Sequence, residues 1–262
     1  MNPEHSPHDA DPSREVRPHE IEVKILDIGD VEAMRQKIVS LGATLVRERR
    51  LLRDQSYNRP KHSDAVTQTI TVSTASAHDP DRFKGMMEFL GLRIIGEQDG
   101  EMQLECPAEL PKRSARLRRD ADTLTFTIKE PRNREQLIDD RIELETSLQD
   151  PGGVIELLQR MGYQVRSERE KYRTSYDLNG TLIEINEGPA GKPWLEVEGP
   201  SQEAVQQVVG LLGFQPQDMA NISEGDMYER HGVPEEQIRR LKFSPPSGSA
   251  ESSDGDSPIS QT

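Results

Sequence analysis

Charged residues alternate with branched apolar residues in several short segments of this chain. The first of them, residues 20–24, reads Glu-Ile-Glu-Val-Lys. Because successive side chains of a strand point to opposite faces, its three charged residues share one face, and Ile21 and Val23 share the other. The same alternation recurs in residues 116–118, 141–145, 171–173, 184–186 and 196–198. The pattern predicts several β-strands that carry acids and bases side by side on one surface.

Three further segments have apolar residues at helical spacing. They are residues 31–41, 154–161 and 205–212, and each buries one stripe of a helix. Asp30 and Ser201 can cap the first and third helices, and Asp150-Pro151 can start the second. A glycine ends each helix, at Gly42, Gly162 and Gly213.

The chain contains an internal repeat. Each predicted helix follows a charged, alternating strand, and the first two helices are followed by similar segments that contain Ser56-Tyr57 and Ser175-Tyr176. A duplicated strand–helix–strand unit is therefore expected. Asn179-Gly180 predicts a hairpin turn, which favours a largely antiparallel sheet.

Residues 60–112 interrupt the repeat, and we interpret them as an insertion within one domain. In this stretch, residues 66–72 and 92–95 are expected to form strands, and residues 83–90 a short helix. The domain is expected to span residues 19–232. Residues 1–18 and most of residues 233–262 have the polar, proline-rich or serine-rich composition of disordered tails.

Composition narrows the classes of function. The 262 residues have a net charge of −14, from 47 acidic and 33 basic residues, which disfavours nonspecific binding to nucleic acid or to an anionic membrane. A polyanionic ligand would therefore need a locally basic pocket. Cys106 is the only cysteine, which excludes an intrachain disulfide. With no long apolar run, this composition predicts a cytoplasmic protein.

The charged face of the predicted sheet has two interpretations. It could be the solvated side of an ordinary antiparallel sheet. It could instead line the lumen of a closed barrel, where buried charges cost several kcal/mol each unless they are paired or bind ligands. Carboxylates there would bind hard divalent cations, and bases would bind phosphates. The residues alone leave both interpretations open.

The motif in residues 20–24 resembles the E-x-E-x-K signature of the CYTH domains, the triphosphate tunnel metalloenzymes. The resemblance covers about residues 19–231, apart from the insertion. Further similar motifs follow in order, at residues 41–43, 114–118, 125–129, 141–145, 170–173 and 194–198.

This resemblance implies an α+β fold, a closed eight-stranded antiparallel β tunnel with helices packed outside. It also implies that the tunnel binds Mg²⁺ or Mn²⁺ and a triphosphate. The implied metal ligands are Glu20, Glu22, Glu143, Glu196 and Glu198. The implied phosphate-binding residues are Lys24, Arg116, Arg118, Lys129, Lys171 and Arg173. The implied catalytic residues are Glu22, Lys24 and Tyr57.

The expected function is divalent-metal-dependent hydrolysis of a triphosphate, with inorganic tripolyphosphate, a nucleoside triphosphate or thiamine triphosphate as substrate. One alternative is a class IV adenylate cyclase, which makes cyclic AMP from ATP. Another is a non-catalytic module that binds polyphosphate or a nucleotide. The expected partner is a small molecule that contains a triphosphate, and neither a nucleic acid nor a membrane. A homodimer is left open.

Three features depart from the family pattern. Asn186 stands where family members usually have Asp, and Glu184 or Glu187 could compensate for the missing carboxylate. The family's Asp-x-Tyr reads Gln55-Ser56-Tyr57 here, so the acid is displaced to Asp54. The insertion is longer than the usual connection and is expected near a tunnel mouth, where it can serve as a lid or restrict substrate size.

Overall fold

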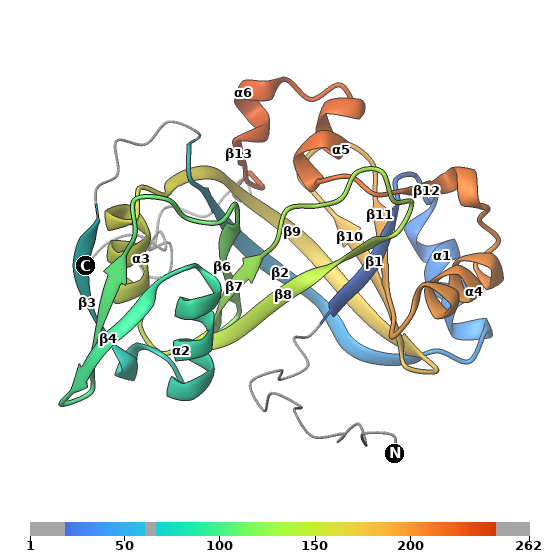
Figure 1. The fold of residues 1–262 in the computed structure, drawn as a ribbon. Helices are drawn as coiled ribbons and strands as arrows, with labels where there is room; N and C mark the ends of the chain where they lie inside the picture. The colour runs from blue at the N-terminus through green and yellow to red at the C-terminus, as the bar shows by residue number, and fades with distance from the viewer. Residues whose placement is uncertain (1–18, 61–66, 245–262) are drawn as a thin grey trace, which may run out of the picture.

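The computed structural model describes residues 19–60 and 67–244, and a closed antiparallel barrel of eight strands lies at its centre (Figure 1). Around the ring the order is β10-β11-β1-β8-β7-β6-β2-β9, and pairing of β9 with β10 closes it. The predicted eight-stranded tunnel is confirmed. The strands are β1 (His19–Ile25), β2 (Thr44–Asn58), β6 (Ser114–Asp120), β7 (Thr123–Lys129), β8 (Asp139–Leu148), β9 (Gln164–Leu178), β10 (Thr181–Glu187) and β11 (Trp194–Glu198).

The strand register brings the charged faces together inside the barrel. On β1, Glu22 lies opposite Glu198 of β11, and Glu20 lies opposite Arg141 of β8. Val23 alternates with these residues and is buried in an apolar core. Strand β1 therefore presents an apolar outer face to the core and a charged inner face to the lumen.

The three predicted helices are present as α1 (Val31–Ser40), α3 (Gly152–Arg160) and α4 (Gln202–Leu211). Asp30 caps α1 by accepting a hydrogen bond from the Ala33 amide (2.8 Å), and Ser201 caps α4 by accepting one from Ala204 (3.2 Å). Helices α1 and α4 share one apolar core with the barrel, while α3 belongs to a second core. In Figure 1, α3 lies on one side of the barrel and α1 and α4 lie on the other.

The duplicated unit explains two long strands. Strands β2 and β9 follow α1 and α3 respectively, each has 15 residues, and they pair antiparallel with several bulges. The expected hairpin also forms, because Asn179 (φ 56°) and Gly180 (φ 81°) both adopt the left-handed conformation between β9 and β10.

The insertion forms a second sheet on the outside of the barrel. It contains β3 (Gln68–Ser73), the short 3₁₀ helix η1 (Thr74–Ser76), α2 (Pro80–Phe89), β4 (Arg93–Gln98) and β5 (Glu101–Cys106), with strand order β3-β5-β4. Strand β5 was not predicted. Helix α2 begins earlier than expected because the Asp79 carboxylate caps it and Pro80 occupies its first position. Phe83 and Met86 of α2 are fully buried in the core that contains α3.

The C-terminal part of the fold comprises η2 (Pro216–Asp218), β12 (Met219–Ala220), α5 (Glu224–Arg230), α6 (Glu235–Ile238) and β13 (Arg240–Leu241). Strand β13 pairs parallel with β9, and the Phe243 ring lies 4.8 Å from the Tyr172 ring. The folded part therefore extends beyond the expected boundary at residue 232. The expected tails at 1–18 and 245–262 lie outside the described residues.

Candidate functional site

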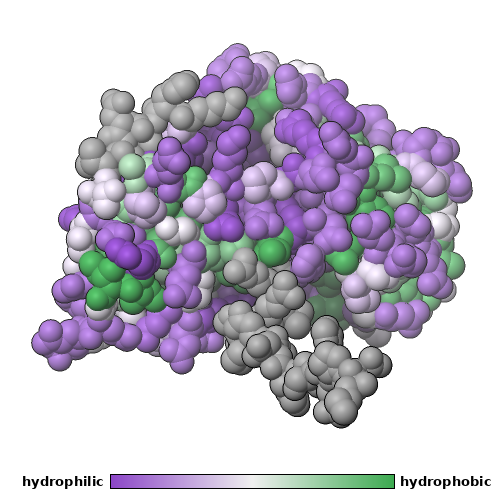
Figure 2. Space-filling view, in the orientation of Figure 1, coloured by the Kyte–Doolittle hydropathy of each residue, from purple (hydrophilic) through white to green (hydrophobic). Residues whose placement is uncertain are grey.

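A cavity of about 500 Å³ occupies the barrel. Among the described residues that line it, Ala115 is the only apolar one, and Phe, Tyr and Trp are absent. Basic side chains outnumber acidic ones in this lining, although the whole chain has a charge of −14. Figure 2 shows hydrophilic side chains gathered over the central strands, with more hydrophobic areas at the two sides.

Strand alternation brings the predicted site residues together. All of them except Tyr57 line this cavity, although they come from six different strands. The residues that line it as predicted are Glu20, Glu22, Lys24, Arg116, Arg118, Lys129, Glu143, Lys171, Arg173, Glu196 and Glu198.

Tyr57 points the other way and does not reach the cavity. It is 1% exposed and belongs to the apolar core that the barrel shares with the insertion. Its hydroxyl donates a hydrogen bond to Gln55 Oε1 (2.5 Å), and burial raises its pKa to about 12. Because strand residues alternate, Ser56 faces the cavity in its place. The expectation that Tyr57 is catalytic is not supported by this geometry.

Three carboxylates form what we call the acidic group: Glu20, Glu22 and Asp139, whose oxygens lie within 4.8 Å of one another. Asp139 was not predicted, and burial raises its pKa. Its oxygens form ion pairs with Arg132 (2.9 Å) and Arg141 (3.0 Å), but neither makes a well-directed hydrogen bond. The group therefore contains a buried carboxylate whose hydrogen-bonding capacity is not used.

The acidic group fits a divalent cation. Mg²⁺ and Mn²⁺ prefer oxygen ligands, and three carboxylates on adjacent strands supply them. Arg132 lies 3.0 Å from Glu22, and Arg141 lies 3.3 Å from Glu20. These arginines balance the charge of the acidic group in the metal-free protein.

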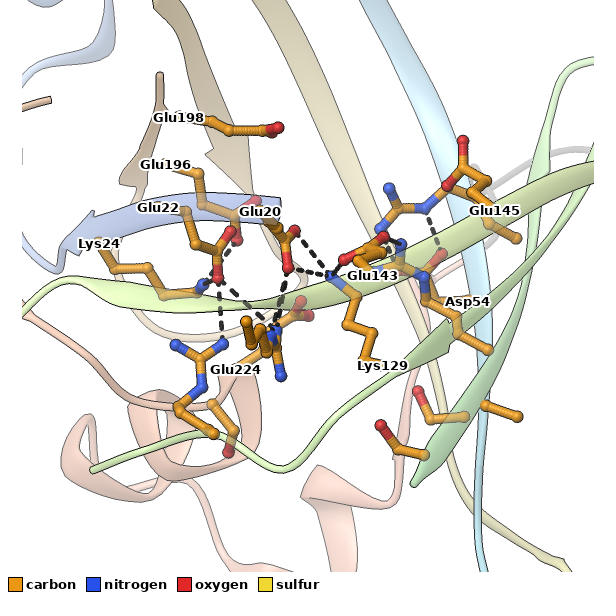
Figure 3. A pocket seen from close by; sticks show the side chains of 18 of the residues that line it. Glu20, Glu22, Lys24, Asp54, Lys129, Glu143, Glu145, Glu196, Glu198 and Glu224 are labelled. Atoms are coloured by element: carbon orange, nitrogen blue, oxygen red, sulfur yellow. Dashed lines mark hydrogen bonds and ion pairs between the residues drawn. The ribbon is translucent and has the colours of Figure 1, made fainter. Parts of the chain in front are cut away.

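Glu198 lies beside the acidic group, and within the described residues no cation forms an ion pair with it, although Lys129 is near enough to lower its pKa. In Figure 3 its side chain is separate from the dashed network that joins Glu20, Glu22 and Lys129. Burial, together with the nearby carboxylates of Glu20 and Glu22, raises the pKa of Glu198 to about 8. The raised pKa favours the protonated form of the Glu198 carboxyl group at neutral pH.

Glu196 has the opposite environment. It contacts Arg173, Lys24 (3.5 Å) and Lys171 (3.9 Å), and Trp194 Nε1 donates a hydrogen bond to it (3.2 Å). Burial by itself would raise its pKa, but these three cations hold the pKa well below its usual value. A metal ion at Glu196, as expected from the sequence, would have to displace these cations.

Glu143 also forms ion pairs with cationic side chains. It forms ion pairs with Lys129 and with Arg116 (3.5 Å). Lys129 in turn contacts Glu20 at 2.8 Å, so this lysine connects the acidic group to the rest of the lining. As a metal ligand, Glu143 would have to give up these pairs.

The opposite side of the lumen is the basic wall, which we define as Arg116, Arg118, Lys171 and Arg173. Arg118 donates two hydrogen bonds to Asp54 (both 2.7 Å), which is the acid displaced from the family motif. Lys171 donates one to Glu224 of α5 (2.9 Å). Burial lowers the pKa of Lys171, although Glu196 and Glu224 act to raise it. The basic wall is thus pre-positioned by carboxylates behind it.

Asn186 contacts Arg173 of the basic wall. Its Oδ1 accepts a hydrogen bond from Arg173 Nε (2.8 Å), and its Nδ2 donates one to the Glu184 carbonyl (3.1 Å). Glu184 pairs with Arg173, and Glu187 pairs with Arg49 (2.8 Å). None of these three residues belongs to the acidic group.

Sequence reasoning missed several lining or adjoining residues: Arg82, Arg132, Asp139, Arg141 and Glu224. Asp139 and Arg141 had a usable signal, because the alternation in residues 141–145 continues back by one step. Arg132 comes from the loop between β7 and β8, and Glu224 from α5, so alternation could not place them.

We compared the chain with models of known protein families. Residues 104–218 match the family model of the CYTH domain. The predicted CYTH resemblance is confirmed. The match begins in β5 and ends at η2, so β1 and its Glu20, Glu22 and Lys24 lie outside it.

Several solved structures share the fold of this chain. The PH1012 protein of Pyrococcus horikoshii OT3 is 21% identical over 78% of this chain and 96% of its own, with a TM-score of 0.51. A conserved hypothetical protein of Pyrococcus furiosus is 16% identical over 78% and 97%, with a TM-score of 0.52. A candidate adenylate cyclase from Vibrio parahaemolyticus is 12% identical over 80% and 97%, with a TM-score of 0.53. At these identities the likeness shows the fold alone.

No curated protein matches the chain. Within residues 19–60 and 67–244, no helix is both long enough and apolar enough to cross a membrane.

Proposed function

We propose that this protein hydrolyses inorganic tripolyphosphate with the help of a divalent metal ion. The observation that carries the proposal is the almost purely charged lining of the cavity. Sites for organic ligands are mostly apolar or aromatic, with a few polar groups that fix orientation. A small inorganic polyanion can bind the basic side chains directly and the acidic ones through a metal ion, and it needs no apolar contact.

The basic wall supplies the phosphate contacts. Arg116 and Arg118 offer guanidinium groups that suit bidentate contacts with phosphate oxygens, and Lys129 adds a point charge near Glu20. Phosphoryl transfer depends mainly on positioned charges around the transferring group, so a rigid set of cations is the main requirement.

The carboxylates of Glu20, Glu22, Asp139 and Glu198 are the proposed metal ligands. When bound there, Mg²⁺ or Mn²⁺ would neutralise phosphate charge and lower the pKa of a bound water. Lys24 keeps Glu22 in place through a 2.8 Å hydrogen bond, and β-sheet register keeps Glu198 opposite Glu22. Glu196 is assigned a different role, because it positions Lys24, Lys171 and Arg173 against the substrate.

The alternatives are less well supported. A cyclase must hold an adenine base, but the described lining offers no Phe, Tyr or Trp ring to stack on it and only Ala115 as an apolar contact. The idea of a non-catalytic module rested on Asn186 as a lost metal ligand. Asn186 contacts Arg173 and is not part of the acidic group. Asparagine in place of the family's Asp at this position therefore removes no carboxylate from that group.

The test is to incubate purified protein separately with tripolyphosphate and ATP, each with Mg²⁺, Mn²⁺ or EDTA. Phosphate release from tripolyphosphate that requires either metal is the expected result. Chromatography of the ATP reactions distinguishes cyclic AMP from ADP and AMP. Cyclic AMP as the main product would favour the cyclase, and binding without turnover would favour the module.

A further inference from the structure

The insertion contributes a side chain to the tunnel. In the described part of the chain, β1 pairs with β8 only along Asp139 to Ile142, which leaves the rest of that β8 edge without a barrel strand. The insertion covers this edge: Ala77 forms a β-bridge with Leu148, and the His78 amide donates to the Ser147 carbonyl (3.0 Å). The start of α2 is thereby fixed at one mouth of the cavity.

Helix α2 holds Arg82 at this mouth. The Asp79 carboxylate accepts a hydrogen bond from the Arg82 amide (3.0 Å), while Phe83 and Met86 anchor the opposite face of the helix in the core. Arg82 Nε donates to the carbonyl of Glu145, and the exposed Arg82 side chain lines the cavity. Its position is therefore set by backbone contacts and packing.

Arg82 differs from most arginines of the lining. Arg116, Arg118, Arg132, Arg141 and Arg173 each form an ion pair with a carboxylate. Among the described residues, no carboxylate is paired with Arg82, whose guanidinium bonds to a neutral carbonyl.

Within residues 19–60 and 67–244, Arg169 also lines the cavity without an ion pair. Its Nε donates to the Ile238 carbonyl (2.9 Å), and its guanidinium lies 5.9 Å from the Tyr228 ring. The nearby Glu224 also interacts with it electrostatically. In the part of the chain that the structure describes, Arg82 has neither an aromatic ring nor a carboxylate of this kind, so its positive charge is available to an anion in the cavity.

We propose that Arg82 is a substrate-positioning residue, through which the insertion binds an anionic end of the substrate at the mouth of the tunnel. This inference rests on the proposed function for the identity of the substrate, an inorganic oligophosphate. The insertion then acts as part of the binding site in addition to covering the β8 edge. A terminal phosphate at this mouth would accept hydrogen bonds from the free nitrogens of the guanidinium.

The test compares Arg82→Gln with Arg93→Gln. Arg93 lies in the same insertion, is also exposed, and pairs with Glu105 (2.6 Å) outside the cavity. Calorimetry with inorganic tripolyphosphate is expected to show a loss of affinity of about tenfold for Arg82→Gln, the scale of one hydrogen bond to a charged group. Arg93→Gln should bind like the wild type.

A merely structural role for Arg82 predicts a different result. Arg82→Lys keeps the charge, so it should lose less affinity than Arg82→Gln, with unchanged thermal unfolding in both variants. In turnover assays, KM for tripolyphosphate should rise about tenfold and kcat should change little, because the contact holds the substrate and not the reacting bond. Lower thermal stability in both variants with equal losses of affinity would point to loosening of α2 and overturn the proposal.

The outcomes also separate this inference from the proposed function. Wild-type protein that binds tripolyphosphate without hydrolysing it would refute the hydrolase, and the Arg82 comparison would still be read by calorimetry. Equal affinity of Arg82→Gln and wild type would refute the role of Arg82 and leave the hydrolase standing. A wild-type protein that does not bind tripolyphosphate would overturn both.

Discussion

Two carboxylates on one face of β11 end in opposite electrostatic regions. Glu196 faces the cations Lys24, Lys171 and Arg173, which hold its pKa well below the usual range. Glu198, two residues later, faces the acidic group, and its pKa is raised to about 8. Burial disfavours the charge of both, so the neighbours decide the sign of the shift. One strand can therefore carry two carboxyl groups of opposite behaviour, one held as an anion by neighbouring bases and one whose neighbours favour its protonated form.

The largest expected effect on activity comes from replacing Glu198. Glu198→Gln should lower metal-dependent tripolyphosphate hydrolysis by at least about 100-fold, because it removes a proposed metal ligand. The measurement is phosphate release at saturating Mn²⁺, with circular dichroism to verify the fold. Glu48→Gln, at an exposed position of β2, is the control and should remain active. Retained activity of Glu198→Gln would show that the metal site is misplaced.

The same substitution at Glu196 should mainly affect stability. Glu196→Gln leaves buried Lys24, Lys171 and Arg173 with one carboxylate fewer. Loss of one partner from a buried ion network typically costs about 3 kcal/mol of unfolding free energy. Urea denaturation at pH 7 measures this. A variant as stable as the wild type would mean that water or other acids already balance these cations.

In metal-free protein, Glu198→Gln should have the opposite effect on stability, and the difference should depend on pH. The raised pKa means that the folded state keeps a proton that the unfolded chain releases, so wild-type stability falls between about pH 4.5 and pH 8. The glutamine variant avoids this loss. It should match the wild type near pH 4.5 and exceed it at pH 9 by up to about 5 kcal/mol, the free energy that corresponds to a pKa difference between about 8 and 4.5.

Urea denaturation in EDTA at several pH values tests this expectation. Parallel pH profiles for Glu198→Gln and the wild type would contradict the assigned environment of Glu198.

The smallest effect is expected at Asn186. Asn186→Asp would place a carboxylate against Arg173, which already contacts Glu184 and Glu196, and would remove the donor to the Glu184 carbonyl. Because Asn186 is not in the acidic group, Mn²⁺ affinity measured by calorimetry should change less than about twofold. A clear gain in metal affinity and activity together would place Asn186 at the metal.

The sequence predicted the barrel because alternation and helix caps act locally. Asp30, Ser201 and Asn179 have the roles that their residue types favour. Alternation also brought most charged site residues to one face. The same rule applied to Asp54 would have placed Tyr57 outside, since residues an odd number apart on a regular strand face opposite sides.

The division of the lumen into two regions could not be predicted in the same way. The pKa of Glu198 depends on Glu20 and Glu22, which approach it only when β1 pairs with β11. Arg82 and Arg132 come from segments outside the alternating strands. Such contacts depend on tertiary packing, which local spacing does not encode.

The position of β1 in the ring sets the timing of assembly on the ribosome. Its barrel partners are β8 and β11, which follow it by more than a hundred residues. At typical rates of synthesis, β1 leaves the ribosome about 6 to 25 s before β8 is complete. Its alternating charges keep this unpaired segment compatible with water in the meantime. The insertion, whose strands pair locally, can fold during that interval. Strand β8 then supplies both Asp139 of the acidic group and the Glu145 carbonyl that holds Arg82.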